Sequence, residues 1–164
     1  MPNNPKYRYL TSKELLDLKE HFINYLASQG ITADLWQKYQ RANDPQIDQH
    51  LAAFSDLILE SVYSSCELLE SISKNTWLFY SFDGGTIYMR GLILESEGDT
   101  DLRELAKEDF SNWNDKVGQG RIKLIKAEKP MDKPKAREVH KLITQGSFIS
   151  RNRSMYERLL QMYD

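Results

Sequence analysis

The run FDGGT, residues 82–86, is the part of the sequence that most suggests a ligand site. Paired glycines can cradle a phosphate or approach a metal ion where a strand meets the N-terminus of a helix. Here both flanks have the apolar pattern of strands. A two-residue loop would put six apolar residues on one face: Leu78, Tyr80, Phe82, Ile87, Met89 and Ile93. We therefore predict a hairpin turn whose glycines supply positive φ angles, without a bound phosphate or metal.

Residues that could support catalysis are scattered. The three histidines, His21, His50 and His140, fall in three separate expected helices, and none has a second histidine or a cysteine at metal-ligand spacing. No nucleophile elbow, HExxH or Walker pattern occurs. Cys66 lies on an apolar stripe, where a cysteine behaves as a small hydrophobe. The sequence therefore predicts no catalytic, metal-binding or cofactor-binding residue, although a site assembled from scattered residues remains an alternative.

Charge is segregated along the chain. Residues 44–109 carry a net charge of −10 and residues 116–158 a net charge of +8. The basic segment could track a nucleic-acid backbone. Its candidate contact residues are Lys123, Lys126, Lys129, Arg137, Lys141, Arg151 and Arg153. However, Phe148 and Tyr156 are its only aromatic residues, and no RNA- or DNA-binding signature occurs. Attraction between two parts of one domain is the favoured explanation.

The elements that must position these residues predict an α+β fold. We expect about five to six helices around a long central helix over 45–72, with a small antiparallel three-stranded sheet made of the hairpin 77–94 and the strand 121–129. A capping box, Thr11 with Glu14, begins a helix over 11–29, and Thr32 caps the next. Later helices are expected after Thr100, before Gly146, and after Ser150 or Asn152.

Length and composition bound the class of protein. A chain of 164 residues with 40% hydrophobic and 28% charged residues fits one globular domain over 1–164, in which residues 1–10 are expected to be a poorly ordered arm. No run is apolar enough for a signal peptide or a membrane span. The single cysteine cannot form an internal disulfide, so we expect a cytoplasmic protein that does not act at a membrane.

Four runs together resemble a family of small bacterial proteins classified only as a domain of unknown function. They are YRYLT at 7–11, ITADLW at 31–36, FSDL at 54–57 and LITQGSFIS at 142–150. The resemblance covers the first 60 or so residues and the last 25, and implies a single bacterial cytosolic domain. It brings no activity, cofactor, partner or site residue.

Taken together, these features favour a non-catalytic module that acts through an unknown protein partner or through self-association as a homo-oligomer. Two alternatives stay open, which are nucleic-acid binding through segment 116–158 and an enzyme whose site is not readable from the sequence. A flat apolar patch would favour the first interpretation, a continuous positive face the second, and a polar cleft containing a histidine the third.

Overall fold

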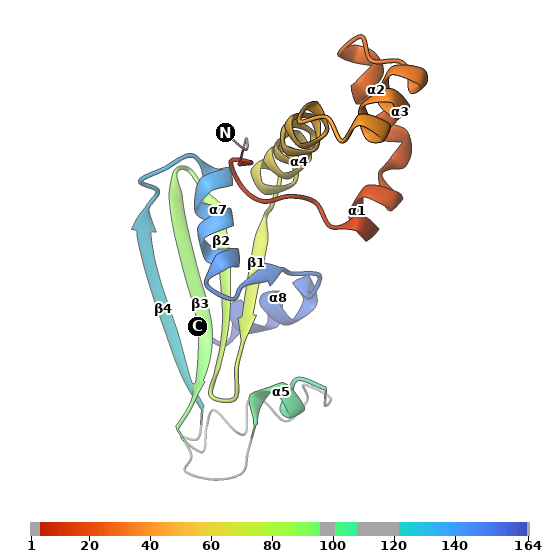
Figure 1. Ribbon diagram of the computed structural model, residues 1–164. Coiled ribbons are helices and arrows are strands. Elements are labelled where there is room, and N and C mark those ends of the chain that lie inside the picture. Colours follow the sequence, from red (N-terminus) through yellow and green to blue (C-terminus); the bar gives the residue numbers. More distant parts are fainter. Residues whose placement is uncertain (1–3, 96–100, 108–121, 164) are drawn as a thin grey trace. The chain divides into compact units, whose positions relative to one another are not determined.

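The computed structural model describes residues 4–95, 101–107 and 122–163, and in them it has an α+β fold with seven helices and five strands (Figure 1). The chain divides into two compact units, Met1–Val62 and Tyr63–Asp164. That the chain forms a single domain stays a prediction.

The first unit is helical. Its helices are α1 (Ser12–Asp17), α2 (Lys19–Ser28), α3 (Ala33–Ala42) and most of α4 (Gln46–Ser64). Both predicted N-caps are confirmed: Thr11 and Glu14 form a capping box, and the Thr32 side chain accepts a hydrogen bond from the Leu35 backbone N–H. The helix expected over 11–29 is instead two helices, because the chain leaves helical geometry at Leu18 (φ −103°, ψ 17°). Nothing in the structure explains this interruption.

Residues before α1 are held against α4 by hydrogen bonds. The Asp56 carboxylate accepts the backbone N–H groups of Lys6 and Tyr7, at 2.7 and 3.1 Å. The Ser55 hydroxyl oxygen accepts the N–H of Leu10 at 3.0 Å. Two of the runs noted in the sequence, 7–11 and 54–57, are thereby joined, because two side chains of α4 satisfy three backbone donors of an extended segment.

The second unit is built on an antiparallel sheet with strand order β4-β3-β2-β1-β5. Its strands are β1 (Leu68–Ile72), β2 (Thr76–Asp83), β3 (Thr86–Leu94), β4 (Ile122–Pro130) and β5 (Phe148–Ile149). The predicted two-residue hairpin is confirmed, since Phe82 pairs with Ile87 and the φ angles of Gly84 and Gly85 are +55° and +80°. Strand β4 lies at one edge of this sheet.

The three-stranded sheet and the 45–72 helix are wrong in detail. Helix α4 ends at Ser64, and residues 68–72 form β1, which pairs with β2 over its whole length. Both Leu68 and Leu69 are buried although they point to opposite faces of the sheet, so the strand is covered on both sides and gains more from burial than helix propensity would give. Cys66 consequently lies in the link between α4 and β1 rather than on a helix, although it is buried as predicted.

The two faces of the sheet differ in what covers them. The face that carries Trp77 and Phe79 packs in a core cluster with Met155 and Leu159 of α8 (Arg153–Gln161), and Leu102 of α5 (Leu102–Leu105) joins the same cluster; we call it the α8 face. The other face includes Phe82, and the Lys135 ammonium at the start of α7 (Lys135–Thr144) lies 5.6 Å from its ring centre. We call this the α7 face, and Figure 1 shows α7 and α8 on opposite sides of the sheet.

Helices α7 and α8 match their predicted boundaries, whereas α5 ends at Leu105 and is shorter than the helix expected after Thr100. Asn152, one of the two candidates, caps α8, and Gly146 follows α7 with a φ of +109°. Asp101 caps α5, while Thr100 and residues 108–121, where that helix was expected to begin and continue, lie outside the described residues.

Candidate functional site

A hollow in the helical unit is a groove between α2 and α3, with a volume of about 330 Å³. Helix α2 contributes Lys19, Ile23 and Leu26, which share one face because they recur at i, i+4 and i+7. The turn and helix α3 contribute the rest of the lining, which is Ile31, Thr32, Ala33, Trp36, Gln37 and Gln40. Lys19 is the only charged residue of this lining. The lining is therefore mostly apolar, with one cation and a few uncharged polar groups.

Local sequence explains how α2 ends and α3 begins within a short turn. Gly30 has a φ of +76°, and its N–H and that of Ile31 bond back to the carbonyls of Ala27 and Leu26, as in a Schellman motif. The side chains of Ile31 and Leu26 are both buried and form part of the lining of the groove. Thr32 then caps α3, so the turn between the two helices consists only of residues 29–32.

Aromatic packing holds the α3 wall in place. The ring of Trp36 meets Phe22 edge-on, with ring centres 5.4 Å apart, and Phe22 packs against the fully buried Phe54 at 5.0 Å. Such pairs add to area burial and restrict ring rotation. In contrast, Ile23 on the α2 wall has 53% of its surface exposed. The groove thus combines a fixed aromatic wall with an aliphatic side chain that gains burial only when something covers it.

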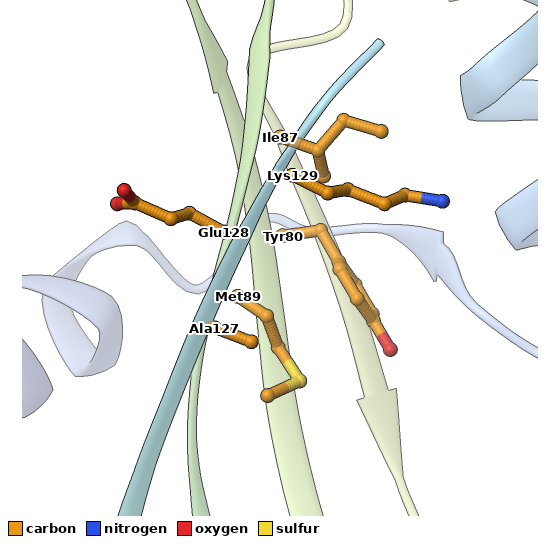
Figure 2. A pocket seen from close by; sticks show the side chains of 6 residues that line it. All are labelled: Tyr80, Ile87, Met89, Ala127, Glu128 and Lys129. Carbon is orange, nitrogen blue, oxygen red and sulfur yellow. The ribbon is translucent and has the colours of Figure 1, made fainter. Parts of the chain in front are cut away.

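A second hollow, of about 180 Å³, lies on the α7 face of the sheet (Figure 2). Its apolar lining comes from Tyr80, Ile87, Met89 and Ala127 of three adjacent strands. Figure 2 shows the Lys129 side chain extending on the same side as Tyr80, while Glu128 points the opposite way. Burial raises the pKa of the Tyr80 hydroxyl, so the group stays protonated at neutral pH.

The histidines do not line either hollow. His21 is exposed on α2, and Nδ1 of His50 lies 3.2 Å from the Tyr25 hydroxyl, whose pKa is raised by burial. The His140 ring packs against Tyr63 with ring centres 5.7 Å apart. Each histidine of the described chain therefore sits in a different surrounding, and neither of these two linings includes one.

Strand alternation separates the basic residues proposed for nucleic-acid contact. Lys123 and Lys129 are on the α7 face, because they pair with Ile93 and Ile87, whereas Lys126 pairs with Arg90 on the α8 face. The Lys123 ammonium also lies 2.7 Å from the Glu95 carboxylate. The lysines of β4 thus project to both sides of the sheet.

The other four basic residues extend this division. Arg137 and Lys141 are exposed on α7, Arg151 lies between β5 and α8, and Arg153 of α8 pairs with the Glu67 carboxylate. Since α7 and α8 lie on opposite sides of the sheet (Figure 1), the seven residues do not share one surface.

Sequence reasoning missed the groove. The run ITADLW contains four of its lining residues, at 31, 32, 33 and 36, and the matching spacing of Lys19, Ile23 and Leu26 on α2 was the available signal. That spacing alone cannot tell a face packed on a core from one left open. Only the exposure of Ile23 in the folded chain makes the distinction.

Comparisons with known proteins place the chain by family only. A family model described as "Family of unknown function (DUF6495)" matches residues 1–164. Searches among curated proteins and among solved structures found no match. Within the described residues, no group of three or more His, Cys, Asp and Glu side chains could hold a metal ion. In the same part of the chain, no helix is both long and apolar enough to cross a membrane.

Proposed function

The chain belongs to this family of unknown function, DUF6495, and we propose that it is a non-catalytic protein-interaction module whose docking site is the α2–α3 groove. One observation supports this proposal. On one side of the groove the Trp36 ring is held by packing against Phe22, and on the other side the aliphatic side chain of Ile23 is exposed. Residues of this kind dominate binding energy when a partner covers them.

The shape of the groove favours a helical partner. Its α2 wall runs from Lys19 to Leu26, which at ~1.5 Å per residue is about 10 Å, or two helical turns. A helix laid in such a groove would bury apolar side chains at i and i+3 or i+4. The occupant we propose is therefore an amphipathic helix of another protein with two aliphatic anchors.

The charge of the groove lining indicates which residues the partner helix should carry. Lys19 is the only ionic group in the lining, and it stands at one end of the α2 wall, so an acidic residue beside the anchors would complement it. The remaining polar groups, Thr32, Gln37 and Gln40, can exchange hydrogen bonds at the rim without adding charge.

We also propose a cytoplasmic location. The support is the single cysteine, Cys66, which lies buried in the second unit and has its pKa raised by burial, as expected of a thiol with a packing role in a reducing compartment.

The test uses one groove variant and one matched control. Ile23→Glu places a carboxylate in the groove, and Leu57→Glu makes the same replacement on α4 outside it, at a similar exposure (53% and 59%). A photo-crosslinking amino acid is placed at position 23 or 57 in the native host, and the captured protein is then purified. Its affinity for the wild type and both variants is measured by calorimetry.

We expect Ile23→Glu to weaken binding at least tenfold, about 1.4 kcal/mol, and Leu57→Glu to leave it within twofold. Circular dichroism checks that both variants are folded. If no captured protein loses affinity on Ile23→Glu, or if Leu57→Glu weakens binding equally, the groove is not the docking site.

A further inference from the structure

The outer edge of strand β4 has the features of a surface that pairs with a second copy of itself. Within the described chain, β4 is hydrogen-bonded to a neighbouring strand on one side only, and its residues from Lys126 to Pro130 are all exposed. A free edge of this kind presents unpaired N–H and C=O groups to other strands.

Side chains from the α8 face hold this edge in place. The Arg90 guanidinium donates to the carbonyl oxygens of Met89 and Ala127, at 2.9 and 3.4 Å. The Tyr163 hydroxyl donates to the Ile125 carbonyl, and it accepts the Gly91 N–H at 2.9 Å. These hydrogen bonds hold β4 in place beside β3. Less conformational entropy is therefore lost when another strand pairs with the outer edge of β4.

Two charges on β4 have no ionic partner within residues 4–95, 101–107 and 122–163. Neither Lys126 nor Glu128 forms an ion pair with any residue that the structure describes. Lys126 is also directly opposite Arg90 on β3, so two cations face each other on the α8 face. Like charges at opposed positions of a sheet are unfavourable, and a carboxylate on the other side of Lys126 would offset them.

We propose that two copies of the chain pair edge to edge through β4, antiparallel, about a twofold axis at Ala127. This register places Lys126 of each copy opposite Glu128 of the other, both on the α8 face. Two ion pairs then form, and the five-stranded sheets become one sheet of about ten strands.

Neighbouring registers lack this complementarity. Residues opposed across the axis must share a face, so the axis can move only by whole residues along β4. An axis at Lys126 opposes that lysine to itself, and an axis at Glu128 opposes two carboxylates. An axis at Ile125 places Lys126 against Leu124. Charge therefore selects the register centred on Ala127.

The hollow in Figure 2 supports the same register. Ala127 is part of its lining, so the two copies would place their hollows side by side on the α7 face (Figure 2). On that face Lys129 lies opposite Ile125 of the second copy, where its aliphatic stem can cover the isoleucine while the ammonium stays in water. Pairing of one strand buries little surface, so the dimer is expected to dissociate on dilution.

Sedimentation velocity of the full chain, from roughly 1 µM to 1 mM, tests the proposal. We expect a dimer whose population rises with concentration. Lys126→Glu or Glu128→Lys should raise its dissociation constant on the order of tenfold, because either change places two pairs of like charges opposite each other across the twofold axis. The double variant Lys126→Glu/Glu128→Lys should regain wild-type association. A mixture of the two single variants should also dimerise, because its charges are complementary. Lys129→Glu, whose opposite residue is Ile125, is the control and should change little.

Crosslinking gives an independent readout. Ala127→Cys should form a disulfide between copies under mild oxidation, whereas Lys129→Cys should not, because only residue 127 faces itself. The native Cys66 is 5% exposed and does not compete. A wild-type chain that stays monomeric at 1 mM overturns the proposal. So does a dimer whose strength is unaffected by both charge reversals, or a mixture of the single variants that fails to associate.

Discussion

At the scale of single residues, Gly91 shows how closely the sheet is packed. A Cβ atom at this position would lie 2.6 Å from both the Trp77 carbonyl oxygen and Cδ2 of Leu78. The same residue binds the Tyr163 hydroxyl through its N–H, at 2.9 Å, and through its carbonyl, at 3.2 Å. The absence of a side chain at Gly91 therefore allows the close contact between β2 and β3.

We expect Gly91→Ala to lower the free energy of unfolding by about 1 to 3 kcal/mol, because one of the two clashing atoms belongs to the backbone and cannot rotate away. Urea denaturation measures this effect. Gly84→Ala is the comparison, since it has a φ of +55° with no atom within 4 Å of the new Cβ, and should cost only about 1 kcal/mol of backbone strain. Equal losses for the two variants would contradict the steric explanation.

At the scale of elements, the start of α1 shows how short-range contacts define a helix end. Glu14 accepts the Thr11 N–H at 2.8 Å, and both of its carboxylate oxygens accept hydrogen bonds from the Arg8 guanidinium, at 2.8 and 2.9 Å. The hydrogen bond from Arg8, followed by that from Thr11, lowers the pKa of Glu14 from 4.5 to about 2. The charged carboxylate thus stabilises the cap.

The sign of this shift predicts a pH dependence. Because the pKa of Glu14 is lower in the folded than in the unfolded chain, its contribution is full above about pH 5 and is lost as the pH falls from about 4.5 to about 2. The side chain is 39% exposed, so solvent screening keeps this contribution within about 1 kcal/mol.

Glu14→Gln should therefore destabilise the protein at pH 7 and progressively less toward pH 2, as measured by urea unfolding at each pH. Glu20→Gln on α2 is the control, because Glu20 is exposed and has no hydrogen bond or ion pair among the described residues. A loss on Glu14→Gln that stays constant from pH 7 to pH 2 would show that the charge of Glu14 is not what stabilises the cap.

At the scale of the whole molecule, the basic residues that lie close together along the sequence are distributed over several elements of the fold. The basic segment 116–158 carries a net charge of +8, but its described part is divided between β4, α7 and α8. These elements present their cations on both sides of one sheet, and two of the cations, Lys123 and Arg153, are paired with acids. A polyanion would therefore meet only part of the charge from any one direction.

We expect the full chain to bind generic RNA or DNA weakly at low salt and not measurably at ~150 mM salt, where the Debye length is about 8 Å. A gel-shift titration measures this. Sub-micromolar retention at ~150 mM salt that is abolished by Lys123→Glu, Lys126→Glu and Lys129→Glu together would instead make nucleic-acid binding the leading function.

The features that the sequence determined by itself are those set by neighbours in the chain. Thr11, Thr32 and Asn152 cap helices because a side-chain oxygen reaches an N–H three residues on, and Gly84 and Gly85 turn the hairpin because they tolerate positive φ. The hairpin register also followed from local alternation, since a slip of one residue would reverse its faces.

Only the tertiary structure decided the features that depend on distant partners. Residues 68–72 suit a helix or a strand locally, and they are a strand because β2 pairs with them and Glu70 accepts hydrogen bonds from Trp77 and Ser150. The two-residue β5 exists only as a partner of β1. The α2–α3 groove also depends on the tertiary structure, because the exposure of a side chain depends on what covers it rather than on its neighbours in sequence. The lysines of β4 are divided between the two faces of the sheet by the pairing of β4 with β3.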